Sequence, residues 1–199
     1  MKQLNLLDAY LSEYAHRPYT YCFESYRRLV QRTLPQPNIP IITVAGSNGK
    51  GSCVNVLQSC YEAAGYQVAV YTSPHLKTFC ERLVINGKQV SKQQWCDAFA
   101  WVACMPYVGS WFASVTLAAY FLILQAQVDL IILEVGLGGA QDPVNAWQAD
   151  VAVITSIELE HQAQLGPTLN DIALAKAGII HSHTHAIIAE SVPEVVRAY

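Results

Sequence analysis

The sequence predicts an α/β fold, a mostly parallel sheet with helices on both faces. Several short segments are unbroken apolar runs rich in β-branched residues, as expected of strands buried on both faces. These runs alternate with longer segments of helical periodicity, which is the order of a parallel sheet with crossover helices. Glycines and polar residues follow most runs, at the edge where parallel sheets bind ligands. A chain of 199 residues, 52% of them hydrophobic, is long enough to bury a core.

The first part of the chain is expected to contain two helices, a strand and a third helix. Apolar residues recur with helical spacing over 3–15 and 23–33, and the proline-rich stretch that follows ends the second helix. The run "IITVAG" (41–46) predicts a buried strand. After a glycine-rich loop, helical spacing resumes over 52–65 and stops at a glycine.

The middle of the chain is expected to add a strand, a hairpin and two helices. "QVAVYTSP" (67–74) is a second apolar run, and an Asn-Gly pair within 75–90 signals a tight hairpin turn. Residues 91–104 and 111–126 have helical character. The apolar core of the second of these helices is shorter than the roughly 20 residues that span a bilayer, so we expect it to be a buried helix.

The last part of the chain is expected to contain three more strands. "VDLIILEVGLGG" (128–139) is a strand that runs into a glycine turn, and "DVAVITSI" (150–157) is another. A helix over 168–177 and a strand over 185–190 follow, and the final residues begin a further helix.

Charge and cysteine usage exclude several classes of protein. The net charge of −3 gives no broad surface that would attract a polyanion. The first residues lack the long apolar stretch of a signal peptide. The six cysteines form no C-x-x-C pair, which favours reduced thiols over a disulfide framework. We therefore expect a cytoplasmic protein that binds neither nucleic acid nor a membrane.

The loop "VAGSNGKGS" (44–52) is similar to a phosphate-binding loop. The common pattern is G-x-x-x-x-G-K-[ST], but here Gly51 separates Lys50 from Ser52 and a valine stands at the first glycine position. A strand, a glycine-rich loop and a helix in succession let backbone N–H groups surround a phosphate. Lys50 would reach the outer phosphates, and Ser52 would bind Mg²⁺ or cap the helix. An ordinary glycine turn is the alternative.

Other polar residues of interest each have two interpretations. Glu134 ends the apolar run "LIILE", where a carboxylate needs either Mg²⁺ or a buried ion pair. His161 is a metal ligand or a loop histidine. Lys176 has a role in the site or is matched to the dipole at the end of its helix. The alternating histidines of "HSHTH" (181–185) form a transition-metal site or a histidine-rich turn.

Several motifs occur in an order that is typical of one superfamily. They are "VAGSNGKGS", "YTSPHLKTFCERLVINGKQVS", "ILEVGLGG", "DPVN", "DVAVITSIELEH" and "LGPTLNDIALAKAGII". Over about residues 40–181 the chain resembles the Mur ligase superfamily, most closely folylpolyglutamate synthase and dihydrofolate synthase. In this family the P-loop takes the variant form, with a glycine between the lysine and the hydroxyl residue.

The resemblance implies an ATP-dependent amide ligase of folate biosynthesis and one-carbon metabolism. ATP phosphorylates a carboxylate to an acyl phosphate, and the amino group of L-glutamate then attacks it. The carboxylate belongs to dihydropteroate or to a folate. The implied cofactors are ATP and Mg²⁺, and the complete enzyme is expected to be a monomer.

The resemblance also implies roles for residues at matching positions. The loop residues expected to bind the nucleotide are Gly46, Asn48, Gly49, Lys50, Gly51 and Ser52. The expected magnesium ligands are Ser52, Ser73, Glu134, His161 and Lys176. Those expected to act in catalysis are Lys50, Lys176 and His161. Carbamylation of Lys176 would turn a cation into an oxygen ligand, which would allow a second Mg²⁺ to bind near the acyl phosphate.

The chain departs from the family pattern at several positions. Ser47 and Glu160 stand where threonine and aspartate are usual. The stretch after "GLGG" keeps Asp142 and Asn145 but lacks the usual arginine and threonine. The substituted residues in that stretch and at the start of the buried helix are Ala140, Pro143, Val144 and Ala113.

Family enzymes are also longer than this chain. We therefore expect residues 1–199 to be a partial N-terminal ATP-binding domain, with the C-terminal glutamate-ligase domain absent. The alternative is a non-catalytic nucleotide-binding remnant or interaction domain. A P-loop kinase or GTPase is a third and weaker hypothesis, because those proteins need the hydroxyl residue directly after the lysine.

Overall fold

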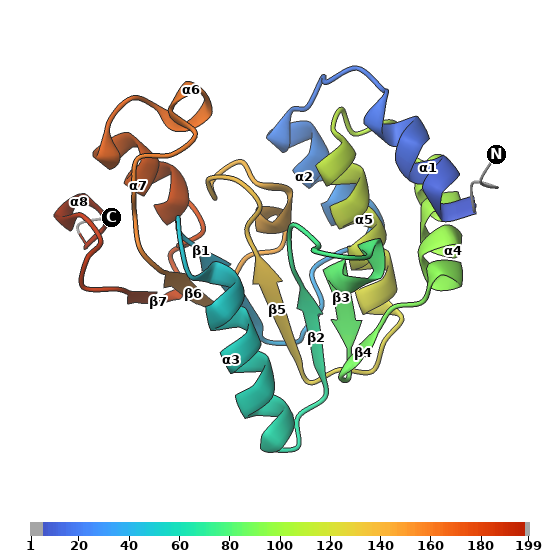
Figure 1. Ribbon diagram of the computed structural model, residues 1–199, viewed down its shortest axis with the longest axis horizontal. Helices are drawn as coiled ribbons and strands as arrows, with labels where there is room; N and C mark the ends of the chain where they lie inside the picture. The colour runs from blue at the N-terminus through green and yellow to red at the C-terminus, as the bar shows by residue number, and fades with distance from the viewer. Residues whose placement is uncertain (1–5, 198–199) are drawn as a thin grey trace.

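The structure is a computed structural model that describes residues 6–197. Within these residues the chain forms one seven-stranded sheet in the order β4-β3-β2-β5-β1-β6-β7 (Figure 1). The strands are β1 (Ile41–Ala45), β2 (Val68–Tyr71), β3 (Leu83–Ile85), β4 (Lys88–Gln89), β5 (Leu130–Glu134), β6 (Val151–Ile154) and β7 (His185–Ile188). The apolar runs therefore form strands as predicted, although each strand is shorter than its run because the polar residues at its end turn into a loop.

Most of the sheet is parallel, as the alternation of strands and helices predicts. β2, β5, β1, β6 and β7 run in one direction, and the two antiparallel pairings are those of β3 with β2 and with β4. The predicted hairpin turn is confirmed: Asn86 and Gly87 have φ of 51° and 72°, the left-handed conformation that a two-residue turn requires. The carboxyl ends of the parallel strands thus lie along one edge of the sheet.

The predicted helices are present, with small differences at their ends. The α-helices are α1 (Leu6–Ala15), α2 (Phe23–Thr33), α3 (Lys50–Ala63), α4 (Lys92–Ala103), α5 (Trp111–Leu124), α6 (Gln162–Leu165), α7 (Leu169–Ala177) and α8 (Glu194–Arg197). Two 3₁₀ helices, η1 (Phe79–Arg82) and η2 (Pro143–Ala146), complete the elements. The sequence did not predict α6, η1 or η2, because one turn is too short for a periodic pattern. Residues 3–5 of the first predicted helix lie outside the described residues.

Helices cover both faces of the sheet, which confirms the predicted fold class. Alternate strand residues such as Ile131 and Leu133 face the larger core, which α1, α2, α4, α5 and α7 complete. The intervening residues, such as Ile132, face α3, whose Val54 is fully buried against them. α3 stands apart from the other helices in Figure 1.

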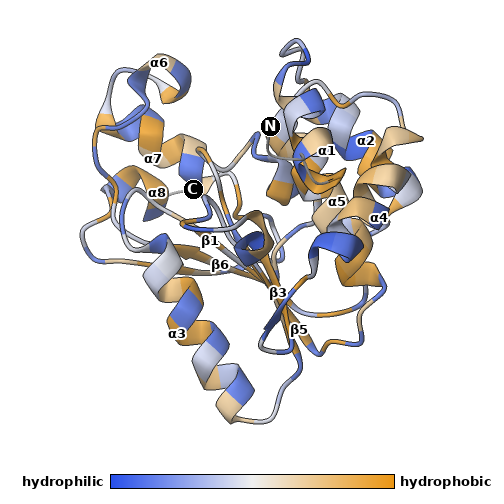
Figure 2. Ribbon diagram, turned by 45° about the vertical axis from the view of Figure 1, so that its right-hand side comes forward, coloured by the Kyte–Doolittle hydropathy of each residue, from blue (hydrophilic) through white to orange (hydrophobic). Residues whose placement is uncertain are grey.

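α5 is a buried helix, as its sequence predicts. Ten of its 14 residues are buried, and Figure 2 shows it coloured as strongly apolar. In the described part of the chain, no helix is both long and apolar enough to cross a membrane. All six cysteines are free thiols, in agreement with the prediction from their spacing.

Candidate functional site

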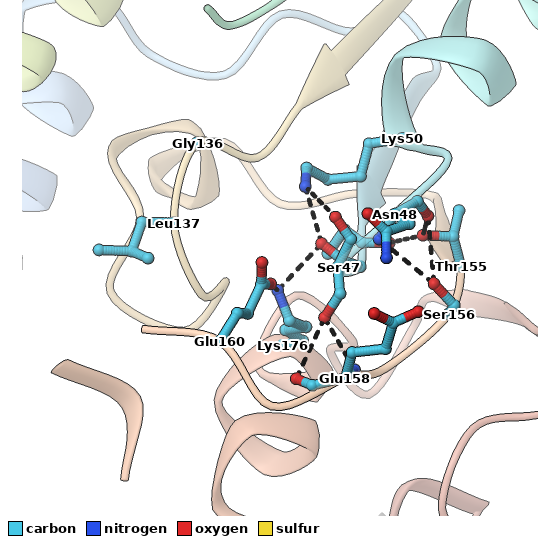
Figure 3. A network of polar contacts seen from close by, with 12 residues as sticks. Ser47, Asn48, Lys50, Gly136, Leu137, Thr155, Ser156, Glu158, Glu160 and Lys176 are labelled. Carbon is cyan, nitrogen blue, oxygen red and sulfur yellow. Dashed lines mark hydrogen bonds and ion pairs between the residues drawn. The ribbon is translucent and has the colours of Figure 1, made fainter. Parts of the chain in front are cut away.

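The glycine-rich loop follows β1 and is held by the loop after β6. Ser47 N–H donates to Ser156 O at 2.7 Å, and Asn48 N–H donates to the Ser156 hydroxyl at 3.2 Å (Figure 3). The Thr155 hydroxyl donates to Asn48 O at 2.7 Å. The Ser47 hydroxyl accepts from Glu158 N–H at 2.9 Å. Two loops more than 100 residues apart in the sequence thus fix each other.

Two loop positions require glycine. Gly46 has φ of 143°, and a Cβ atom there would lie 1.8 Å from the Thr155 hydroxyl oxygen. Gly49 has φ of 84° and is the N-cap of α3. Of the two roles predicted for Ser52, that of helix cap is wrong: α3 begins at Lys50, so Ser52 lies inside its first turn. Gly49 offers no side-chain acceptor, which leaves the first-turn N–H groups available to an anion.

Lys50 folds back over its own loop. Its ammonium donates to Gly46 O at 2.8 Å and to Ser47 O at 3.2 Å, and the side chain is half-buried. Both partners are neutral carbonyls, and a phosphate oxygen is a stronger acceptor for an ammonium group than either. Lys50 is therefore positioned to move onto an anion that enters beside the loop.

Lys176 reaches the same carbonyl from the other side, and it does not face solvent at the end of its helix. Its side chain is 3% exposed, and its ammonium donates to Gly46 O at 2.9 Å and to the Glu160 carboxylate at 2.8 Å. Burial lowers the pKa of Lys176, and Glu160 opposes that shift. Burial also acts on Glu160, but its hydrogen bonds with Lys176 and Ser47 hold its pKa below the usual value.

Ser73 and Glu134 meet at the ends of β2 and β5, as the prediction of a shared rim requires. Glu134 is 5% exposed, and its carboxylate accepts from Ser73 N–H at 3.0 Å. Its other oxygen lies 3.7 Å from the position of a Cβ built on Gly51, which places it beside the first turn of α3. Burial raises the pKa of Glu134, and the charges of Lys50 and Arg82 partly offset this.

His161 and Ser52 lie at more exposed positions than Ser73 and Glu134. His161 is exposed with φ of 47°, and it lines a small cavity together with Lys50, Glu160 and Lys176. Ser52 is exposed on α3. Residues 6–197 contain no cluster of three or more His, Cys, Asp or Glu side chains that would hold a metal by themselves. A cation here would therefore need further ligands from a bound molecule.

The "HSHTH" segment forms a turn, not a metal site. The His181 ring lies 2.9 Å from the Asn145 side-chain oxygen, and the Asn145 amide donates to Ala140 O and Gly178 O. Asn145 therefore ties the loop after β5 to the end of α7. This accounts for an asparagine that the sequence pattern singles out without explaining.

A second, larger cavity of about 760 Å³ opens beside the small one, and Gly136, Leu137 and Gly138 line both. Its wall includes the aromatic side chains of Tyr19, Tyr21 and Phe112 and also the side chains of Arg82 and Asp142.

Asp142 anchors the shared loop. Its carboxylate accepts from the N–H groups of Gly136 at 3.0 Å, Leu137 at 2.8 Å and Val144 at 3.0 Å. Burial raises its pKa to about 6 although these three bonds oppose the shift. Asp142 also caps η2, with a proline at its first position, and an Asp-Pro pair is a signal for such a cap.

Sequence reasoning missed part of this site. It selected Lys50, Ser73, Glu134 and Lys176, but it assigned no role to Arg82 and treated Glu160 only as a departure from a pattern. No local signal distinguishes Arg82, because its importance depends on burial. The Lys176–Glu160 ion pair joins two segments whose approach only the fold determines.

Comparison with known proteins gives a consistent result. A family model described as the Mur ligase middle domain matches residues 44–196. The dihydrofolate synthase/folylpolyglutamate synthase of Escherichia coli (strain K12) is 45% identical over 152 residues, which are 75% of this chain and 36% of that protein. The chain thus spans about a third of the length of that relative.

Solved structures are similar as well. The structure of E. coli FolC in complex with DHPP and ADP has a TM-score of 0.87 at 36% identity, over 96% of this chain and 48% of the other. A bifunctional folylpolyglutamate synthase/dihydrofolate synthase with Mn, AMPPNP and L-glutamate bound has a TM-score of 0.90 at 36% identity, with the same coverage of both chains.

Proposed function

This chain belongs to the Mur ligase family, and we propose that its two adjoining cavities bind Mg-ATP and a folate-type carboxylic acid for ATP-dependent amide ligation to L-glutamate. The observation that carries the proposal is the convergence of Lys50, Glu134, Glu160 and Lys176 at the carboxyl ends of three parallel strands, beside an aromatic cavity. Six free cysteines agree with a reducing compartment, the cytoplasm.

The glycine-rich loop and the start of α3, beside the small cavity, suit the phosphates of ATP. The first turn of α3 presents N–H groups and the positive end of a 14-residue helix. Lys50 and Lys176 both point at Gly46 O, so two cations flank the place where a phosphate would lie. Phosphoryl transfer needs neutralised charge and fixed geometry above all, and the loop provides both.

The donor atoms near the loop fit Mg²⁺. Glu134 is a buried carboxylate, and Ser73, whose N–H donates to it, also carries a hydroxyl group. Mg²⁺ prefers oxygen ligands and is usually held by one or two carboxylates together with substrate phosphates. Ser52 and His161 are proposed as further ligands of the same Mg²⁺ ion. Bound Mg²⁺ would neutralise phosphate charge and orient the transferred group.

Lys176 is proposed as the residue that becomes a carbamate. A lysine with a lowered pKa spends more time as the neutral amine, the form that reacts with carbon dioxide. The carbamate would carry negative charge and oxygen ligands into the small cavity. Glu160 would then have to leave the position in which it now accepts from Lys176.

The larger cavity suits the acceptor. Its volume lies within the range of small-molecule sites, and its aromatic wall would stack on a flat ring system. Because Gly136, Leu137 and Gly138 separate the two cavities, a carboxylate at that boundary would lie next to the terminal phosphate of ATP.

Calorimetry with Mg-ATP on the purified chain tests the nucleotide site. We expect saturable heat, and circular dichroism will verify that the sample is folded. A folded chain that gives no heat at millimolar Mg-ATP would refute the proposal. Glutamate-dependent release of ADP, measured in the same sample with dihydropteroate present, then distinguishes a working ligase from a nucleotide-binding domain without catalysis.

A further inference from the structure

Arg82 is a buried arginine at the boundary of the larger cavity. It ends η1, is 5% exposed, and lines the cavity with Ser73 and Pro74. Its carbonyl accepts from Thr72 N–H at 2.9 Å, which fixes it beside the strand end that carries Ser73. The backbone of Arg82 is thus held beside the segment that leads to Ser73, and both residues line the larger cavity.

The partners of this guanidinium group are neutral. Its Nε donates to His75 Nδ1 at 2.9 Å, and its Cζ lies 5.0 Å from the ring centroid of Trp111 and 5.7 Å from that of Phe79. Burial and the neighbouring Arg82 charge both lower the pKa of His75, so its ring is uncharged at neutral pH. None of these groups supplies a negative charge.

The group also lacks a counterion. None of the ion pairs found among residues 6–197 includes Arg82. Its Nη1 is buried with no hydrogen-bond partner in that part of the chain. An arginine is charged at all physiological pH values, and a buried charge without an anion is strongly unfavourable. Burial lowers the pKa of Arg82; the neutral Tyr71 hydroxyl, and to a smaller degree Glu134 at a distance, oppose that shift.

We propose that Arg82 binds the carboxylate of the acceptor and holds it at the boundary between the two cavities. This inference rests on the proposed function, because it assumes that the larger cavity takes an aromatic carboxylic acid. A planar carboxylate matches the fork of a guanidinium group. The acid would supply the missing counterion, while its ring system packs against Tyr19, Tyr21 and Phe112.

The test crosses two protein variants with two ligands. Binding of pteroate and of its neutral carboxamide is measured by calorimetry, in the presence of Mg-ADP, for the wild-type chain and for Arg82→Gln. We expect the wild type to prefer the acid at least tenfold. Arg82→Gln should lose roughly ten- to a hundredfold in affinity for pteroate but little for the carboxamide, so that the preference disappears.

Two further variants serve as controls for Arg82→Gln. Arg32→Gln removes an exposed arginine of α2 and should change neither affinity. Arg82→Lys keeps the charge without the fork, so it should retain part of the preference even if Arg82→Gln folds poorly. Circular dichroism checks the fold of each variant.

The outcomes separate this inference from the proposed function. If the wild type binds neither ligand, the assignment of the larger cavity fails and the inference fails with it. If the wild type binds both equally, only the inference is overturned. If Arg82→Gln weakened the binding of both ligands equally, the inference would also be overturned. Arg82 would then support the cavity wall without distinguishing the charged ligand from the neutral one.

Discussion

The two cavities on either side of Gly136–Gly138 are lined by different kinds of chemical group. The small one is surrounded by backbone carbonyls, the start of α3 and three charged side chains, two lysines and a glutamate. The larger one has an aromatic wall with a single buried arginine and a single buried aspartate. One loop, anchored by Asp142, forms the partition between them.

The difference follows from what each cavity would hold. A triphosphate is recognised by N–H dipoles and cations, which must be fixed in place before it binds. A flat organic acid gains most of its affinity from buried ring area, and needs only a few polar contacts for orientation. Because the two linings differ in this way, changes in one cavity should leave binding to the other nearly unaffected.

The largest effect is expected at the loop of the small cavity. Gly46→Ala places a methyl group 1.8 Å from the Thr155 hydroxyl oxygen, at a φ of 143° that alanine rarely adopts. We expect a loss of about 3 kcal/mol or more in the free energy of unfolding, together with loss of Mg-ATP binding. Urea denaturation and calorimetry measure the two effects.

Gly51→Ala is the matched control for that change. Its Cβ would approach nothing closer than 3.7 Å, and it lies in a helix, where alanine is favoured. Its free energy of unfolding should stay within about 1 kcal/mol of the wild type or increase. Equal destabilisation by both substitutions would contradict the account of the loop.

The stability of the protein should depend on pH through Asp142, which anchors the loop between the two cavities. Its pKa is about 6 in the folded protein against an ordinary value of 3.8, so between these values the folded chain binds more protons than the unfolded chain. The contribution of Asp142 to stability is therefore highest below about pH 4, and roughly 2–3 kcal/mol of it is lost as pH rises through 6.

Denaturation curves across this pH range, compared between wild type and Asp142→Asn, isolate that contribution. The variant should be less stable overall, because its amide oxygen can accept from Gly136 and Leu137 but its amide nitrogen, in place of the second oxygen, cannot accept from Val144 N–H. It should also lack the decline between pH 4 and 6. Parallel pH profiles for the two proteins would show that Asp142 titrates elsewhere.

A smaller effect is expected from the loop lysine. Lys50→Met removes the ammonium group, and should weaken Mg-ATP binding roughly ten- to a hundredfold, the effect of about 1.5–3 kcal/mol for a charge-assisted hydrogen bond. Pteroate binding should be unchanged. Lys88→Met, at the exposed hairpin, is the control and should alter neither. A matching loss of pteroate affinity in Lys50→Met would break the proposed independence of the cavities.

The smallest effect is expected at the rim of the aromatic cavity. Tyr19 is 77% exposed, so Tyr19→Ala should weaken pteroate binding by only about 0.5–1.5 kcal/mol while Mg-ATP affinity is retained. Tyr66→Ala, which changes an exposed tyrosine remote from the cavity lining, serves for comparison. Fluorescence titration is suitable for both, and a larger effect on nucleotide than on pteroate would contradict the assignment.

Much of this molecule could be predicted from local pattern. The apolar runs identified the strands of the parallel sheet, the Asn-Gly pair identified the hairpin, and the glycine-rich loop identified the start of the site. These features follow from properties of neighbouring residues: side-chain periodicity, β-branching and the conformational freedom of glycine. The sequence by itself therefore determined the fold class, the edge of the sheet where the candidate site lies, and the placement of Lys50, Ser73 and Glu134 near that edge.

Only the tertiary structure decided how the charged groups are paired. Lys176 and Gly46 are 130 residues apart, and their contact at 2.9 Å exists because the fold brings the end of α7 to the loop that follows β1. Arg82 is left without a counterion because Trp111, Phe79 and His75 surround it. Long, flexible side chains of this kind adopt the direction that packing leaves open, and no local pattern encodes that direction. The difference between a solvated cation and a buried one arises only when distant segments exclude water together.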